Sequence, residues 1–315
     1  MGQQQRDIVH CAFSTDENYA QHCAGAMASV LANSPDLAFH FHLIQDALPL
    51  DTLERLRTTI ASFTNGTLSV HTLESSTFSH FRVDDHITLA AYYRLFLPVL
   101  LGPEVERIIY LDADLVARHS LRPLWECDMA GHPIAAVYDT HGEGSAERLG
   151  MPANHPYFNS GVLVIDLAAW RARDVLPKFV AYIEANFGRL RYHDQDVLNA
   201  VFINDVHYLD LRWNTQVRTR TSDVAGAVIG TADPFASLAD PAIAHFTGNR
   251  KPWRFRDHVR FEDEYLRYLA RSGFADFRQP DRTKFAYLTR KIRTRFPKSA
   301  RAYDGIAWRL RRMTR

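Results

Sequence analysis

The chain has 315 residues, 46% of them hydrophobic and 23% charged, a balance that is typical of a folded protein and excludes a disordered one. Its formal net charge of +1 conceals an uneven distribution, because residues 282–315 hold 12 of the 37 Lys and Arg residues and one of the 36 acidic residues. Residues 1–281 carry about ten excess negative charges, which argues against nucleic-acid binding because phosphates would be repelled.

Apolar runs alternate with helical patterns along most of the chain. The expected strands are residues 7–13, 38–44, 67–73, the start of 106–116, 133–139, 161–167 and 242–246. The expected helices are residues 19–33, 49–64, 88–101, 174–187 and 194–202. This alternation predicts an α/β fold with a mostly parallel sheet. No linker interrupts it, so we expect one domain over residues 1–281 and a separate basic tail over residues 282–315.

The cysteines and the N-terminus bear on the compartment. Cys11, Cys23 and Cys127 lack metal-type spacing and predict no disulfide framework. The first residues have no apolar signal-peptide core, and the most apolar run, residues 95–101, is too short to span a bilayer. We therefore expect a cytoplasmic protein.

Two aspartates follow the apolar run at residues 108–111. Side chains two apart in an extended chain point to the same side, so Asp112 and Asp114 could chelate one divalent ion at the carboxyl end of a strand. Such an ion would stabilise a diphosphate leaving group. With 25 aspartates in the chain, this spacing also arises by chance, so the position after a strand is the stronger argument.

A second pair, Asp194 and Asp196, flanks Gln195 at the start of an expected helix. Helix capping alone would explain Asp194 as an N-cap and Asp196 as a first-turn acid. Alternatively, these side chains lie beside a pocket and hydrogen-bond sugar hydroxyls.

Three residues near the end of the body form another candidate group. His245 ends an expected strand, and a lone histidine is more often structural than a metal ligand. The turn at Gly248 and the charge of Lys251 follow it closely, so the group could also complete an Asp/Asp metal site and contact phosphate.

Two loops allow both a structural and a functional interpretation. Asp16 could simply cap the first helix, yet the first strand–helix loop often binds a nucleotide, on whose base Tyr19 could stack. Asn159 and Gly161 precede the apolar run 162–167 and could serve turn formation alone.

Together these segments resemble family 8 of the retaining glycosyltransferases, and among them the bacterial lipooligosaccharide galactosyltransferases. The matching segments, in order, are DIV…STDENYA, HITLAAYYRL, RIIYLDADLV, PLWECD, YFNSGVLVIDLAAW, HDQDVLNAVF and AHFTGNRKPW. The resemblance implies a GT-A fold, which is Rossmann-like, a UDP-sugar donor and Mn²⁺ or Mg²⁺ as cofactor.

The resemblance also implies roles for individual residues. The implied metal ligands are Asp112, Asp114 and His245. The implied nucleotide and diphosphate contacts are Asp16, Asn18, Tyr19, Gly248 and Lys251, together with the two aspartates of the metal site. The implied donor-sugar contacts are Arg94, Asn159, Asp194 and Gln195. Of these, Asp194 and Gln195 are the expected catalytic residues, and Gln195 would act as a nucleophile or, because an amide is a poor nucleophile, as an electrostatic stabiliser.

The expected activity is retaining transfer of galactose or glucose from a UDP-sugar to a lipopolysaccharide-type glycan. Ala90 and Ala91 replace a hydroxyl-bearing pair of the family, which leaves the acceptor open. The loop at residues 141–155 is expected to cover the donor. The alternative is a catalytically inactive nucleotide-sugar or glycan-binding protein of the same fold.

The basic tail has apolar residues on one helical stripe, namely Phe285, Leu288, Ile292 and Phe296, and a second such segment at residues 303–312. Basic amphipathic helices lie on anionic membrane surfaces, so we expect peripheral attachment to the inner face of the membrane, near a lipid-linked oligosaccharide acceptor. Packing on the domain and nucleic-acid binding are the alternatives, and we expect no nucleic-acid partner.

Overall fold

The computed structural model describes residues 8–73, 92–284, 286–287 and 290–291. The large sheet has seven strands, in the spatial order β3(Gly66–Thr72), β2(Ala38–Gln45), β1(Ile8–Ser14), β4(Arg107–Leu111), β7(Phe158–Asp166), β6(Ile134–Tyr138) and β8(His207–Leu209). β7 runs antiparallel to its neighbours β4 and β6, and the other four strand pairs are parallel. The prediction of a mostly parallel α/β sheet is therefore confirmed.

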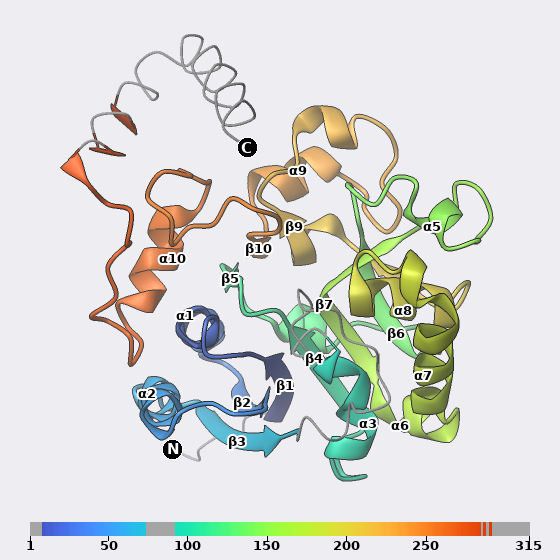
Figure 1. Ribbon diagram of the computed structural model, residues 1–315, viewed down its shortest axis with the longest axis horizontal. Coiled ribbons are helices and arrows are strands. Elements are labelled where there is room, and N and C mark those ends of the chain that lie inside the picture. The colour runs from blue at the N-terminus through green and yellow to red at the C-terminus, as the bar shows by residue number, and fades with distance from the viewer. Residues whose placement is uncertain (1–7, 74–91, 285, 288–289, 292–315) are drawn as a thin grey trace.

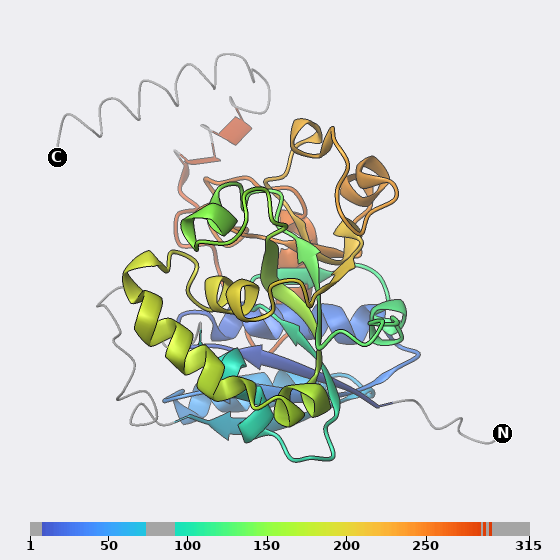
Figure 2. The same cartoon turned by 90° about the vertical axis from the view of Figure 1, so that its right-hand side faces the viewer.

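Alternating residues of β1 separate the two faces of this sheet. Val9, Cys11 and Phe13 enter a core with the helices α1(Ala20–Asn33) and α2(Leu50–Ala61). Ala12 points to the opposite face and joins the core that contains α7(Val175–Asn186). Figures 1 and 2 show α1 on one side of the sheet and α7 on the other. Both faces of the sheet therefore pack against helices, although the β1–β2 end of the second face, with the half-buried His10 and His40, is partly open.

The remaining helices are short. They are η3(Tyr93–Phe96), α3(Leu97–Leu100), α4(Arg122–Trp125), α5(Ser145–Arg148), α6(Leu167–Ala172), η4(Phe187–Arg189), α8(His193–Val201), η5(Leu211–Asn214), η6(Thr221–Val224), α9(Pro234–Ala239) and α10(Glu262–Leu269). None of the helices in the described ranges is both long and apolar enough to cross a membrane.

A second, three-stranded sheet positions the site. Its order is β5(Leu115–Ala117), β10(Ile243–His245) and β9(Thr215–Gln216). β10 pairs antiparallel with β5, and this register places His245 opposite Leu115. The backbone N–H of Phe246 donates to the carbonyl of Asp114 at 2.9 Å. Two segments about 130 residues apart in sequence are thereby joined beside the end of β4 (Figure 1).

The structure corrects one expected helix and one expected helix cap. The predicted helix at 88–101 is, over its described part, the 3₁₀ turn η3 followed by the single turn α3, in which Pro98 stands in the first turn because it lacks an N–H to donate. Asp194 is not an N-cap, since α8 begins at His193 and Tyr192 is its N-cap residue. Ala90 and Ala91, and the tail residues Phe285, Leu288, 292–296 and 303–312, lie outside the described residues.

Candidate functional site

Asp112 and Asp114 lie between β4 and β5, where the chain leaves the large sheet. Nε2 of His245 lies 3.6 Å from Oδ2 of Asp112 and 3.2 Å from Oδ1 of Asp114. One ligand atom from each of the three residues lies within 4.8 Å of the other two. The side chains that the sequence singled out separately are therefore brought together at one point.

The ring orientation of His245 is set by Asn214. Nδ1 of His245 is 2.8 Å from Oδ1 of Asn214, whose amide nitrogen in turn donates to Oδ1 of Asn159 at 2.8 Å. With the amide oriented this way, the proton of a neutral ring is on Nδ1, and Nε2 directs a lone pair at the carboxylate of Asp114. A proton on Nε2 or a bound cation would satisfy both groups at their separation of 3.2 Å, and two carboxylates with one imidazole suit Mn²⁺ or Mg²⁺ as that cation.

Lys251 and Arg94 balance the charge of the aspartates. Nζ of Lys251 lies 2.6 Å from Oδ2 of Asp114, and Nη2 of Arg94 lies 2.8 Å from Oδ1 of Asp112. Burial favours a raised pKa for Asp114, but His245 and Lys251 outweigh burial and hold that pKa well below its usual range. Asp114 is therefore ionised at neutral pH, as a metal ligand must be.

Gly161 on β7 allows this close approach. A Cβ at position 161 would overlap Cε1 of His245 and lie 2.7 Å from Oδ2 of Asp112. Gly161, for which turn formation was one interpretation of the sequence, thus lies next to the carboxylate of Asp112 and the imidazole of His245, where a side chain has no room.

The Gly161→Ala variant is accordingly expected to displace His245 or Asp112. We expect Mn²⁺ affinity to fall at least about tenfold and the free energy of unfolding to fall by about 1–3 kcal/mol, because the added methyl overpacks a buried site. Metal titration and urea unfolding measure the two effects. Gly226→Ala is the control, since a Cβ there meets nothing within 4 Å. Equal losses in both variants would contradict the explanation.

Asp194 extends the charged group toward α8. Its Oδ2 lies 3.1 Å from Nε of Arg94, although the two atoms do not meet in hydrogen-bond geometry. Burial raises the pKa of Asp194 to about 6, and Arg94, which is shared with Asp112, offsets only part of this effect. One buried guanidinium therefore serves two carboxylates.

This pKa predicts a pH dependence of stability. In the unfolded chain Asp194 ionises near 3.8, whereas in the native protein it keeps its proton up to about pH 6. The native state binds the extra proton between these values, so the contribution of Asp194 to stability is present below pH 4 and is lost as pH rises to 6, by about 3 kcal/mol at most. The Asp194→Asn variant should lack this loss in urea unfolding from pH 4 to 7. An unchanged difference between the variant and the wild type across that range would refute it.

Gln195 is fixed by a buried hydrogen-bond network. Its Oε1 accepts from the backbone N–H of Ser160 at 3.1 Å and from Nδ2 of Asn159 at 3.0 Å. Its Nε2 donates to Oδ2 of Asp139 at 3.0 Å. Because the backbone donor identifies the oxygen, the amide orientation is defined. Asp139 also accepts from Nε2 of Gln216 at 2.6 Å, which ties α8 to β9.

Asp196 anchors the loop that sequence reasoning placed over the donor. It is fully buried, forms two hydrogen bonds with Arg148 at 2.8 and 2.9 Å and accepts from the hydroxyl of Tyr157 at 2.5 Å. It also accepts from the backbone N–H groups of Arg191 and Tyr192, just before α8. Asp196 therefore joins α5 to the start of α8, a larger role than a first-turn acid.

The first strand–helix loop lies at the edge of the same site. Oδ1 of Asp16 accepts from the backbone N–H of Tyr19 at 3.0 Å, but Tyr19 is the N-cap residue of α1 and no side chain caps that helix, so the capping interpretation of Asp16 is wrong. Asn18 is exposed, and Tyr19 is 37% exposed with its ring edge-on to Trp253 at 5.7 Å. The ammonium of Lys251 lies 5.4 Å from the ring of Trp253. The loop is thus adjacent to the residues after β10.

Gly248 has a φ of 76°, the left-handed conformation that glycine adopts without strain. The preceding Thr247 donates its hydroxyl to Oε1 of Gln216 at 2.9 Å. The expected turn after His245 is therefore present, and it leads the chain back so that Lys251 reaches both Asp114 and the carbonyl of Phe246.

Sequence reasoning missed three residues of the network, Asp139, Asn214 and Gln216. Asp139 ends the apolar run 133–139, just as Asp112 follows the run 108–111. An aspartate at the end of an expected strand was therefore visible in the sequence at both positions. Asn214 and Gln216 belong to η5 and β9, short elements without any periodic pattern.

Comparison with known proteins identifies the class of this fold. The galactosyltransferase LgtC, solved in complex with donor and acceptor sugar analogs, is 26% identical and superimposes with a TM-score of 0.71 over 83% of this chain and 95% of that one. General stress protein A of Bacillus subtilis is 30% identical over 269 residues, which are 84% of this chain and 94% of that protein. The lipopolysaccharide 1,3-galactosyltransferase of Salmonella typhimurium is 26% identical over 257 residues, or 78% and 73% of the two chains.

The fold is therefore the Rossmann-like GT-A fold of glycosyltransferases. The profile described as "Glycosyl transferase family 8" matches residues 10–257, and the chain belongs to that family. The resemblance found from the motifs is thus confirmed.

Proposed function

We propose that this protein is a retaining hexosyltransferase that moves galactose or glucose from a UDP-sugar to a glycan of the lipopolysaccharide type. The observation that carries the proposal is the convergence of Asp112, Asp114 and His245, with Nε2 of the histidine held toward Asp114. The family relatives that are named lipopolysaccharide galactosyltransferases and glucosyltransferases support this choice of sugars and acceptor.

In this proposal the three side chains hold Mn²⁺ or Mg²⁺, which would offset the negative charge of the leaving diphosphate. Lys251 adds a second positive charge beside Asp114. Gly248 lets the backbone approach the phosphates, and Asp16, Asn18 and Tyr19 bind the uridine. A low-dielectric site makes such fixed charges effective at the moment the bond to the sugar breaks.

The donor sugar would lie between Arg94, Asn159, Asp194 and Gln195. The acceptor hydroxyl would attack the anomeric carbon on the face from which the diphosphate departs. Its proton would pass to the departing phosphate oxygen, so no separate base is required. The two hydrogen bonds to Oε1 of Gln195 occupy its lone pairs, which argues against covalent attack by the amide, and the proposed role is electrostatic stabilisation of the positive charge that develops on the sugar.

The test is release of UDP from a panel of nucleotide sugars with and without Mn²⁺, alongside thermal shifts of the same mixtures. We expect UDP-galactose or UDP-glucose to raise Tm when Mn²⁺ is present, and UDP to be released slowly by hydrolysis and faster with an acceptor glycan. Binding without any turnover would instead indicate the inactive binding protein. Neither binding nor turnover with any UDP-sugar would overturn the proposal.

We further propose that the tail beyond Lys291 attaches the enzyme to an anionic membrane surface. The first residues of the predicted tail lie on the body: Ala286 is buried, and Nη1 of Arg290 lies 2.8 Å from Oε1 of the buried Glu262. A cavity of about 430 Å³ between α10 and this segment touches none of the candidate catalytic residues. We therefore place the boundary of the membrane-binding segment after residue 291.

Deletion of residues 292–315 is expected to abolish co-sedimentation with vesicles that contain phosphatidylglycerol, because it removes eight of the chain's 37 Lys and Arg residues together with the apolar side chains among them. The rate of UDP release without a lipid acceptor should stay within about twofold of the full chain, since no site residue is removed. Vesicles of phosphatidylcholine alone are the control. Undiminished sedimentation of the truncated protein would exclude this role.

A further inference from the structure

Three histidines share one face of the large sheet, away from the site described above. His10 on β1 and His40 on β2 are paired in the parallel register, and His42 lies two residues further along β2. The intervening residues Phe39 and Phe41 point to the opposite face and enter the core with α1. The pattern AFHFHLI, which reads as an ordinary apolar strand, therefore places imidazoles on one face only.

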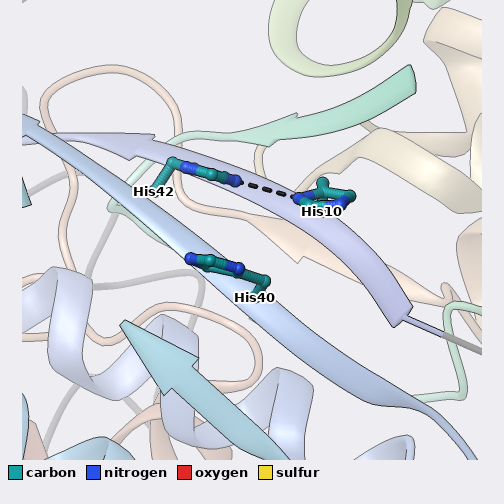
Figure 3. Close-up of side chains that lie close together, drawn as sticks. All are labelled: His10, His40 and His42. Carbon is teal, nitrogen blue, oxygen red and sulfur yellow. Dashed lines mark hydrogen bonds between the residues drawn. The ribbon is translucent and has the colours of Figure 1, made fainter. Parts of the chain in front are cut away.

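The ring nitrogens of the three histidines lie close together. Nδ1 of His10 lies 3.0 Å from Nε2 of His42, and one nitrogen from each of the three rings lies within 4.8 Å of the others. The rings of His40 and His42 stack nearly parallel with centroids 4.5 Å apart, as Figure 3 shows. The 3.0 Å contact is a hydrogen bond between the two rings (Figure 3), and its length is close to the separation of about 3.3 Å between ligand nitrogens that lie 2.0–2.1 Å from a tetrahedral ion. Because stacked rings direct their nitrogen lone pairs side by side, the half-buried ring of His40 would have to rotate to become the third ligand.

Neighbouring groups orient these rings. Nδ1 of His42 is 3.0 Å from Nε2 of His71, and Nε2 of His40 is 2.8 Å from the hydroxyl of Ser69 on β3. Such second partners fix the tautomer of a metal-binding histidine and direct its other nitrogen. His10 and His40 are only half-buried, so an ion could reach them from solvent.

We propose that His10, His40 and His42 form a second metal site, which takes a divalent transition ion of the zinc class. None of the three ligands is a carboxylate, and imidazoles select Zn²⁺, Ni²⁺ or Cu²⁺ over Mn²⁺ and Mg²⁺. The two sites on this chain would thus hold different ions, and the bound ion would cross-link β1 to β2.

The charge state of the cluster agrees with this role. Burial and the neighbouring imidazoles lower the pKa of His42 to about 3 and also lower the pKa of His10. Both rings are therefore neutral at pH 7 and need not lose a proton before they bind an ion.

The test uses the full-length Asp114→Asn protein, in which the other site is impaired, after removal of metals with EDTA. We expect one Zn²⁺ per chain by isothermal titration and equilibrium dialysis, and a rise in Tm on binding. Adding His40→Gln or His10→Gln should weaken Zn²⁺ binding at least about tenfold and remove the rise in Tm. His258→Gln, which changes an exposed histidine on the body, is the matched control.

Equal Zn²⁺ affinity with and without His40→Gln and His10→Gln would overturn the proposal. Circular dichroism in EDTA checks that each variant folds, and His10→Gln and His40→Gln serve as independent substitutions on different strands. X-ray absorption at the zinc edge of the Asp114→Asn protein gives a direct reading. Three imidazole nitrogens in the shell are expected, and a shell of carboxylate oxygens or thiolate would refute the assignment.

Discussion

Replacing Asp114 by asparagine is expected to lower Mn²⁺-dependent UDP release at least about a thousandfold, the largest effect of any single substitution considered for this protein. Asp114 is the side chain that both His245 and Lys251 contact, at 3.2 and 2.6 Å. An amide there would remove one anionic ligand and leave Lys251 uncompensated beside the bound ion. Metal affinity and kcat should therefore fall together, and excess Mn²⁺ should restore only part of the rate.

Asp205→Asn is the matched control for that result. Asp205 also pairs with a histidine, His132 at 2.9 Å, and with an arginine, but its side chain is 37% exposed and lies outside the site. Exposed ion pairs contribute little, so we expect its Tm and kcat to be close to those of the wild type. A kcat for Asp114→Asn within about tenfold of the Asp205→Asn value would show that the aspartate pair does not hold a catalytic ion.

The parts of the fold that follow from local patterns could be predicted. The strands β1, β2 and β4 are apolar runs bounded by polar residues, and α1 and α2 follow them with helical spacing. The direction of β7 could not be predicted in this way, since a strand buried on both faces reads alike whether it runs parallel or antiparallel. The four-residue helices α3 and α5 could not be predicted from hydrophobic periodicity, because four residues cover only about one helical turn.

The candidate site shows the same division. Asp112, Asp114 and His245, the candidate metal ligands, lie in recognisable sequence motifs, and the family resemblance placed them in one group before any distance was known. Asn214, which orients His245, has no motif, because its role depends on the pairing of β10 with β5 and β9. The pairing of strands that are far apart in sequence thus decides which amide side chains reach the site, and a local sequence pattern cannot predict that pairing.

Gly161 and Asp196 are two residues for which local structure alone was one possible explanation. Gly161 is required by the close approach of His245 and Asp112 rather than by a turn, since it lies within β7. Asp196 is satisfied by five hydrogen bonds from α5, Tyr157 and the start of α8 rather than by the helix alone. In both cases the sequence pointed to the right residue, but the contacts that explain it are made with other elements of the fold.

Gln195→Ala is the second large effect that we expect, a fall in kcat of about a hundredfold with a much smaller change in the KM for the donor. The amide oxygen is held at a fixed position by Ser160 and Asn159, so its partial charge would act on positive charge that develops only in the transition state. Initial-rate kinetics with UDP-galactose and UDP-glucose measure the two constants.

Asn199→Ala separates this role from the loss of packing. Asn199 lies one turn further along α8, is equally buried, and bonds to both backbone groups of Phe158 and to the carbonyl of Gln195. Its removal leaves buried backbone groups unpaired and should lower the free energy of unfolding by about 1–3 kcal/mol with little change in kcat at a temperature where the variant is folded. Gln195→Ala should lower the free energy of unfolding by a similar amount but should also cause a large fall in kcat. If the two variants lost kcat to the same extent, Gln195 would be a structural amide, and Asp194 would be left as the group that could stabilise positive charge on the donor sugar.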